Sequence, residues 1–211
     1  MRAMDSIKSG GRQWARSGST RQALLAGALE VFSSRGYEDA SIAEIVERSG
    51  ASVGSLYHHY GGKAGLFLSL WEDHQRTHEE DAANAVADAR RQGVDDPFEL
   101  FIRGARAFLE GCWERRHVAR LFLEDVGPQG FHLLRRQRVR DWVRRNTKLL
   151  RVDEAHRSGH MLVVVLTTVI AEAGREVAAS ETAKEARELV DETCVILRGL
   201  AGRYASATRS P

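Results

Sequence analysis

The segment Ser41–Lys63, SIAEIVERSGASVGSLYHHYGGK, constrains the fold of this chain more than any other stretch. Apolar residues at helical spacing predict one short helix over Ser41–Ser49 and a second over Ser52–Tyr60. Gly50 lies between them and can adopt the positive φ of a tight turn, which most other residues avoid. Two short helices around such a turn form a helix-turn-helix, whose second helix enters the major groove of DNA. The segment therefore predicts a DNA-binding head.

Serines mark the expected start of each short helix. Ser41 is followed three residues later by Glu44, which fits a capping box, and Ser52 is the expected N-cap of the second helix. Leu56 and Tyr60 have the spacing of an inward-facing pair. The other faces of the second helix then carry Val53, Ser55, Tyr57, His58 and His59. Gly54 costs a helix about 1 kcal/mol relative to alanine, and either a close approach to DNA or tight helix packing could explain that cost.

A longer pattern of residues extends on both sides of this segment. Its pieces are Ala28-x-x-x-Phe32, Arg35-Gly36-Tyr37, Ser41-Ile42-x-x-Ile45 and the run Ser52-x-Gly54-Ser55-Leu56-Tyr57-x-His59-Tyr60-x-x-Lys63-x-x-Leu66. In this pattern the chain over Thr20–Leu70 resembles the DNA-binding domain of the TetR family of transcriptional regulators. Two positions depart from the family: Tyr60 replaces the more usual phenylalanine, and Gly61-Gly62 replaces polar capping residues. The resemblance implies that DNA is contacted by Ser41, Ser52, Val53, Gly54, Ser55, Tyr57, His58, His59 and Lys63.

The chemistry of these side chains fits phosphate groups better than base edges. Helix N-termini present free N–H groups, serine and tyrosine hydroxyls are short donors, and Lys63 supplies a positive charge. The second helix has no Arg, Asn or Gln for a bidentate base contact. Sequence readout would therefore depend on DNA shape and on Ser52, Ser55, His58 and the methyl groups of Val53. The plainer alternative for residues 57–60 is a polar, aromatic helix surface that binds nothing.

The rest of the chain is predicted to be helical. The 3 prolines are sparse, and long stretches repeat their apolar residues at three and four positions. We therefore expect an all-α protein of about nine helices, with an N-terminal three-helix helix-turn-helix domain and a C-terminal ligand-binding and dimerisation domain. The further helices are expected over residues 20–34, 64–91, 96–113, 117–125, 131–150, 154–179 and 181–204.

Four segments are expected along the chain. Residues 1–19 are polar and basic, which predicts a mobile arm. The arm is either simply disordered or contacts DNA through its arginines. The helix-turn-helix domain covers residues 20–65, and the helical effector-binding and dimerisation domain covers residues 66–205. Residues 206–211 are expected to form a disordered tail.

The resemblance also implies a repressor that responds to a ligand. Such a protein binds a near-palindromic operator as a dimer and is released when a small molecule enters its C-terminal domain. The candidate effector-binding residues are Trp71, Phe101, Phe108, Trp113, Phe122, His132 and Trp142. Core packing is the simpler role for each aromatic residue. His132, Arg135 and Arg136 extend the apolar stripe of their helix, so they lie either at the mouth of the core or inside a cavity.

The last two helices carry more apolar surface than a monomer is expected to bury. Met161–Ile170 is apolar nearly all round, and the final helix has apolar residues at three and four positions. TetR-like proteins dimerise through their last two helices, and a twofold four-helix interface would cover this surface. The residues predicted at that interface are Val190, Thr193, Leu197 and Leu200.

Other classes of function have little support in the sequence. No Gly-rich phosphate loop, Gly-x-Ser-x-Gly elbow or multi-ligand metal cluster is found, so no enzyme, cofactor or metal site is expected. His74, His78 and Asp81 have spacing that a metal could use, but a solvated polar face is the preferred interpretation. The alternative function is a helical protein-interaction module with a degenerate DNA-binding head.

Cysteine usage and hydropathy indicate the compartment. Cys112 and Cys194 lie outside any metal-binding or CxxC pattern, which fits reduced thiols in a cytosolic protein. The N-terminus lacks the apolar core of a signal peptide, and Met161–Ala171 is far shorter than the roughly 20 residues that span a bilayer. A net charge of +2 is too balanced to indicate nucleic-acid binding by itself. We expect a cytoplasmic protein with no membrane contact.

Overall fold

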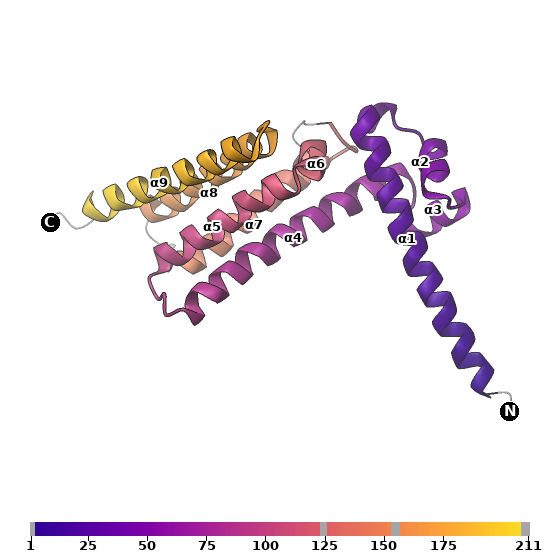
Figure 1. The fold of residues 1–211 in the computed structure, drawn as a ribbon. Helices are drawn as coiled ribbons and strands as arrows, with labels where there is room; N and C mark the ends of the chain where they lie inside the picture. The colour runs from indigo at the N-terminus through magenta and orange to yellow at the C-terminus, as the bar shows by residue number, and fades with distance from the viewer. Residues whose placement is uncertain (1–2, 123–125, 153–156, 208–211) are drawn as a thin grey trace. The chain divides into compact units, whose positions relative to one another are not determined.

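The computed structural model describes residues 3–122, 126–152 and 157–207, with side chains described between residues 18 and 201. Within those ranges the chain forms nine α-helices, one short 3-10 helix and no strand, which confirms the all-α prediction (Figure 1). The chain divides into two compact units, Met1–Asp73 with Glu124–Gln129, and His74–Leu123 with Gly130–Pro211. Helix α4 (Lys63–Arg91) carries the division within its length. No helix in the described part is long and apolar enough to cross a membrane.

The first unit begins with helix α1 (Ala3–Asp39), which starts well before the predicted residue 20. The predicted arm over residues 1–19 therefore overlaps the start of a helix, and its mobility stays a prediction. Gly36 lies near the end of this helix. Its φ of 77° and ψ of 172° break the helical backbone there, before a last short stretch leads to Asp39.

The helix-turn-helix forms with the predicted caps. Helix α2 (Ile42–Ser49) starts from Ser41 in a complete capping box, because the Ser41 hydroxyl accepts from the backbone of Glu44 and the Glu44 carboxylate accepts from the backbone of Ser41. Gly50 ends α2 with φ 64° and ψ 11°, as the tight turn requires. Helix α3 (Val53–Tyr60) starts from Ser52, whose side chain accepts from the Ser55 backbone N–H.

Close backbone approaches hold the helices of the first unit together. A β-carbon placed on Gly65 would lie 1.7 Å from the carbonyl oxygen of Tyr60, so only glycine fits where α4 begins against the end of α3. A β-carbon on Gly27 of α1 would lie 3.0 Å from the Ser49 nitrogen at the end of α2. Apolar side chains fill the space between these helices. The most deeply buried are Leu24, Ala28, Phe32, Ile45, Leu56, Leu66 and Phe67.

The second unit is a bundle of longer helices. After α4 come α5 (Pro97–Glu114), α6 (Arg116–Ala119), the 3-10 helix η1 (Arg120–Phe122), α7 (Phe131–Leu150), α8 (Arg157–Ala179) and α9 (Ala183–Ala207). Asp96 caps α5 and Pro97 occupies its first turn. The helix predicted over residues 117–125 is instead α6 followed by η1, and residues 123–125 lie outside the described residues.

Helices α8 and α9 lie side by side and share a core with α5 (Figure 1). Cys112 and Cys194 belong to this core and are both free thiols, and burial raises the pKa of Cys112 to about 12. Helix α9 reaches Ala207, so it enters the region predicted as a disordered tail, and residues 208–211 lie outside the described residues.

Candidate nucleic-acid interface and ligand cavity

Helix α3 has one face inside the first unit and one face outside it. Leu56 is fully buried and Tyr60 is 9% exposed, as predicted. By contrast, Val53 is 49% exposed and Tyr57 is 53% exposed. Ser52, Gly54 and His58 are also exposed, whereas Ser55 and His59 are half-buried. The predicted contact residues of this helix therefore share one accessible surface.

Gly54 lies on that surface without any packing reason for being a glycine. A β-carbon placed there would have only the Ser52 hydroxyl within reach, at 3.9 Å. Tight helix packing, one of the two explanations open from the sequence, is therefore excluded within the described structure. Glycine at this position costs the helix about 1 kcal/mol relative to alanine, and it leaves a backbone without a side chain on the outward face. Such a backbone suits the close approach of an external partner.

Hydroxyl groups line the N-terminal end of the same surface. The Ser52 hydroxyl accepts from the Ser55 N–H at 3.1 Å and lies 3.0 Å from the Ser55 hydroxyl. The Ser41 hydroxyl donates to the Glu44 carboxylate at 2.9 Å. Each serine thus fixes a helix start, where unpaired N–H groups and the positive end of the helix dipole favour an anion.

The two histidines of α3 have different surroundings. Their rings lie 4.9 Å apart, with His58 exposed and His59 half-buried. Burial lowers the pKa of His59 below its ordinary value, and the nearby His58 and Arg21 lower it further. His59 is therefore neutral at physiological pH and offers hydrogen bonding rather than charge.

Lys63 has a role inside the unit that the sequence did not indicate. Its ammonium group donates to the carbonyl oxygens of Tyr37, Glu38 and Ala40 at 2.8, 2.9 and 3.0 Å. It also lies 4.7 Å from the centre of the Tyr37 ring. All three donors of the ammonium are used, so Lys63 fastens the end of α1 and the loop after it to the start of α4. A direct phosphate contact would require one of these bonds to be released.

The hydroxyl group of Tyr60, which a phenylalanine at this position would lack, makes a hydrogen bond inside the unit. That hydroxyl donates to the carbonyl oxygen of Arg21 in α1 at 2.9 Å. The guanidinium of Arg21 lies 5.9 Å from the centre of the Tyr60 ring. The inner face of α3 is thus anchored to α1 by a hydrogen bond as well as by apolar packing.

The second unit contains a largely apolar cavity of about 300 Å³ between α4, α5, α7 and α8. Of the predicted effector residues, Phe101, Phe108 and Trp142 line it. The others are placed elsewhere: Trp71 is buried in the first unit, Phe122 packs against His74 and Phe131, Trp113 lies under the Arg116 guanidinium, and His132 is exposed. Periodicity identified large aromatic residues correctly, but it could not indicate which of them border empty space.

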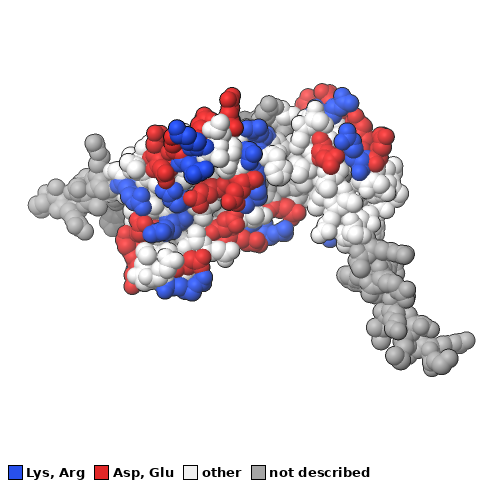
Figure 2. Space-filling model, in the orientation of Figure 1, with Lys and Arg blue, Asp and Glu red and all other residues white. Residues whose placement is uncertain are grey.

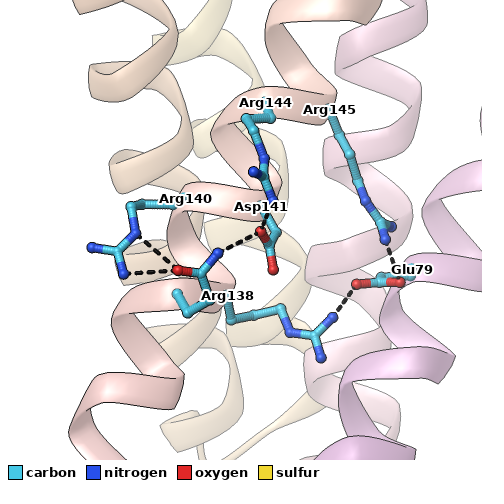
Figure 3. A network of polar contacts seen from close by, with 7 residues as sticks. Glu79, Arg138, Arg140, Asp141, Arg144 and Arg145 are labelled. Carbon is cyan, nitrogen blue, oxygen red and sulfur yellow. Dashed lines mark hydrogen bonds and ion pairs between the residues drawn. The ribbon is translucent and has the colours of Figure 1, made fainter.

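The polar groups of the cavity come from three helices. Glu79 of α4 is paired with Arg138 and, at 2.8 Å, with Arg145, both from α7 (Figure 3). Asn146 donates to the Thr167 hydroxyl of α8 at 3.0 Å, and both side chains are buried. Elsewhere on the surface seen in Figure 2, acidic and basic side chains are interspersed.

The histidine pair of α4 corrects a sequence interpretation. His74 and His78 were expected on a solvated face, but they are 8% and 1% exposed, with their Nε2 atoms 3.1 Å apart. Arg115 lies 3.2 Å from His78 Nδ1 and donates to Asp81 at 2.6 Å. Arginine only donates, so His78 is protonated on Nε2 and His74 on Nδ1, a buried N–H with no partner in the described residues. No metal-binding group of three ligands occurs in the described part.

The predicted dimer-interface residues are also placed differently. Val190, Thr193 and Leu197 are 2%, 7% and 0% exposed, because they pack into the core of their own chain. Leu200 is half-buried against the same core. The apolar residues that α8 and α9 turn outward are Met161, Val165, Val195 and Ile196. The final helix thus has two apolar stripes. The predicted interface residues belong to the stripe that packs against the chain's own core.

Comparisons with known proteins agree with this architecture. Residues 24–70 match the family model described as "Bacterial regulatory proteins, tetR family". The chain is 35% identical over 138 residues to the "HTH-type transcriptional regulator BetI 1" of Chromohalobacter salexigens, a match covering 60% of this chain and 62% of that protein. It is 38% identical over 80 residues to the "HTH-type transcriptional repressor AcnR" of Corynebacterium glutamicum, covering 37% of this chain and 43% of the repressor. These matches span less than two thirds of either relative.

Solved structures resemble the chain over more of its length. A TetR-family transcriptional regulator from Pectobacterium atrosepticum aligns with a TM-score of 0.59 and 28% identity, covering 88% of this chain and 96% of that one. A TetR-family regulator from Syntrophomonas wolfei aligns with a TM-score of 0.68 over 86% of this chain and 94% of its own. Its identity of 17% means that this second likeness concerns the fold alone.

The Lys63 contacts predict a stability effect. Lys63→Met should lower the unfolding free energy by about 1–3 kcal/mol, because three carbonyl oxygens lose a charged donor. Lys184→Met is the matched control, since the Lys184 side chain is 85% exposed and pairs with Glu188 alone among the described residues. Urea denaturation followed by circular dichroism measures both. Equal stability of the two variants would contradict the structural role of Lys63.

The buried histidine pair predicts sensitivity to acid. Burial, with help from Arg115 and His117, lowers the pKa of His74 from 6.5 to about 4. The unfolded chain therefore binds a proton that the folded chain does not, and stability falls as the pH drops from 6.5 towards about 4. His74→Gln should lose less stability than the wild type between neutral pH and about pH 4.5 in urea titrations. The exposed His160→Gln should behave as the wild type does, and an unchanged slope in His74→Gln would disprove the assignment.

Proposed function

We propose that this chain is a TetR-family transcriptional repressor, which binds a palindromic operator as a homodimer and is released by a small molecule. The observation that carries the DNA-binding part is the outer face of α3, where an unobstructed Gly54 lies beside exposed Val53 and Tyr57. Because an operator is part of the cell's DNA, we also propose a cytoplasmic location.

The contacts with DNA divide by chemistry. The N-terminal ends of α2 and α3, with Ser41, Ser52 and Ser55, face phosphate groups, and Tyr57 adds a phenol donor. The bare backbone of Gly54 allows α3 to enter the major groove deeply enough for Val53 and His58 to reach base edges. His59 contributes at the edge of this surface as a neutral ring. Lys63 supports the surface by fastening α1 to α4.

The dimer forms through the outward stripe of α8 and α9. Met161, Val165, Val195 and Ile196 are 55%, 42%, 67% and 55% exposed, which is unusual for such large apolar residues in adjacent helices. A β-carbon on the neighbouring Gly199 would meet nothing, so another helix can approach closely there. A twofold dimer supplies two copies of α3, one for each of two successive major grooves, about 34 Å apart.

The effector binds in the cavity of the second unit. Its apolar walls and few polar groups have the character of a small-molecule pocket, and its volume of about 300 Å³ is sufficient for one. Release from DNA needs only that the ligand bind unequally to the DNA-bound and free conformations. Glu79 lies in α4, so a change at the cavity acts on a helix that continues into the first unit.

Gly54→Ala separates stability from DNA binding. The variant should be as stable as the wild type or more stable by up to about 1 kcal/mol, because alanine favours a helix and meets no obstacle. Its affinity for an operator selected from random fragments should fall about tenfold, since a methyl group stands between backbone and DNA. Mobility-shift titration and thermal denaturation measure the two effects. Gly18→Ala, another unobstructed helical position, is the control, and undiminished affinity in Gly54→Ala would refute the interface.

Ile196→Glu tests the dimer. A buried carboxylate on each side of a twofold seam is costly, so the variant should be a helical monomer. Leu133→Glu changes a similarly exposed residue of α7 outside the stripe and should leave the dimer intact. Light scattering gives the mass and circular dichroism the helix content. A dimeric Ile196→Glu variant would mean that the chains associate through another surface.

A further inference from the structure

The cavity has an electrostatic asymmetry that indicates the charge of its ligand. Three charged residues line it, Glu79, Arg90 and Arg145. The single carboxylate is already shared by two guanidinium groups, since Glu79 pairs with Arg145 and with Arg138 behind it. Arg90 has no ion-pair partner among the described residues. Positive charge therefore exceeds negative charge around the cavity.

Arg145 is the group best placed to meet a ligand. Its side chain is 51% exposed, whereas the Glu79 side chain is 18% exposed, so the arginine is the mobile partner of the pair. Its guanidinium lies 5.7 Å from the centre of the Trp142 ring, which itself lines the cavity. The guanidinium can turn from Glu79 to another carboxylate while Arg138 continues to neutralise Glu79.

A cation would meet the opposite situation. It would have to join two guanidinium groups around one carboxylate, and its charge would be repelled by Arg145 and Arg90 at the same time. A neutral ligand could hydrogen-bond to the Asn146 and Thr167 groups of the lining but would leave the excess positive charge unpaired. Most of the remaining lining is apolar, with Phe101, Phe108 and Ile170 as large side chains, so the ligand needs an apolar body as well.

We infer that the effector is an amphipathic organic anion, whose apolar body fills the cavity between Phe108 and Trp142 and whose carboxylate takes the place of Glu79 at Arg145. The regulatory role of this ligand rests on the proposed function, but its binding to the cavity does not require DNA. The exchange keeps every charge paired: the ligand neutralises Arg145, and Glu79 remains with Arg138.

Three probes with the same hydrocarbon chain test the inference: decanoate, decanol and decyltrimethylammonium, each titrated below its micelle concentration into the full-length protein without DNA. Calorimetry should show that decanoate binds at least tenfold more tightly than the other two. Trp142 fluorescence should change on binding, and the change should vanish in Trp142→Phe. Tighter binding of the ammonium compound, or equal binding of all three, would overturn the inference.

Neighbouring arginines supply a matched pair of variants. Arg145→Gln should weaken decanoate binding about tenfold and leave decanol unchanged. Arg144→Gln should leave all three affinities unchanged, because Arg144 pairs with Asp141 and does not line the cavity (Figure 3). Glu79→Gln removes the competing carboxylate and should tighten decanoate binding, with circular dichroism confirming the fold. Undiminished decanoate affinity in Arg145→Gln would overturn the inference even if Glu79→Gln did not fold.

A separate measurement distinguishes this inference from the proposed function. Operator affinity is measured by mobility shift with and without saturating decanoate. Anion-selective binding that leaves operator affinity unchanged supports the ligand class and contradicts regulation through the cavity. Release of the operator by decanoate in the wild type, reduced in Arg145→Gln, supports both.

Discussion

The anchoring of α3 by its inner face is the interaction on which the rest of the structure depends. Leu56 is fully buried, the Tyr60 hydroxyl is bonded to a carbonyl oxygen of α1, and Lys63 fastens the end of α1 to the start of α4. These contacts satisfy the polar groups of the inner face within the unit. The outer face is therefore free to carry Gly54, where a β-carbon would meet only the Ser52 hydroxyl at 3.9 Å, and Tyr57, which is 53% exposed. Such residues on a rigidly held helix are best explained by an external partner.

The sequence predicted best where local rules decide the structure. The capping box at Ser41, the left-handed Gly50 and the start of α3 after Ser52 depend on neighbours three residues away, and all three are confirmed. Periodicity also identified the inward pair of α3. It failed in α9, where Leu197 and Ile196 belong to two apolar stripes, because spacing alone cannot say which stripe faces the chain's own core. Only the packing of α5 and α8 against α9 decides that question.

Polar residues were harder to place than apolar ones, because their burial depends on distant partners. Arg115 and His74 satisfy the buried ring of His78, although no sequence pattern connects Arg115 with the two histidines. In the sequence Lys63 has the character of a surface cation, but in the structure its ammonium group donates to three carbonyl oxygens of residues 37–40. Similarly, nothing in the sequence marks Glu79 and Arg145 as parts of a ligand site. Their candidate role follows only from the cavity that both residues line.

The central claim is that two copies of α3 read one operator together. Fragments selected by the full-length protein from random DNA, then mapped by hydroxyl-radical footprinting, measure this directly. We expect two protected half-sites related by twofold symmetry, with centres about one helical turn, or about 34 Å, apart. A single unpaired footprint, or binding that ignores sequence and disappears at moderate salt, would contradict it.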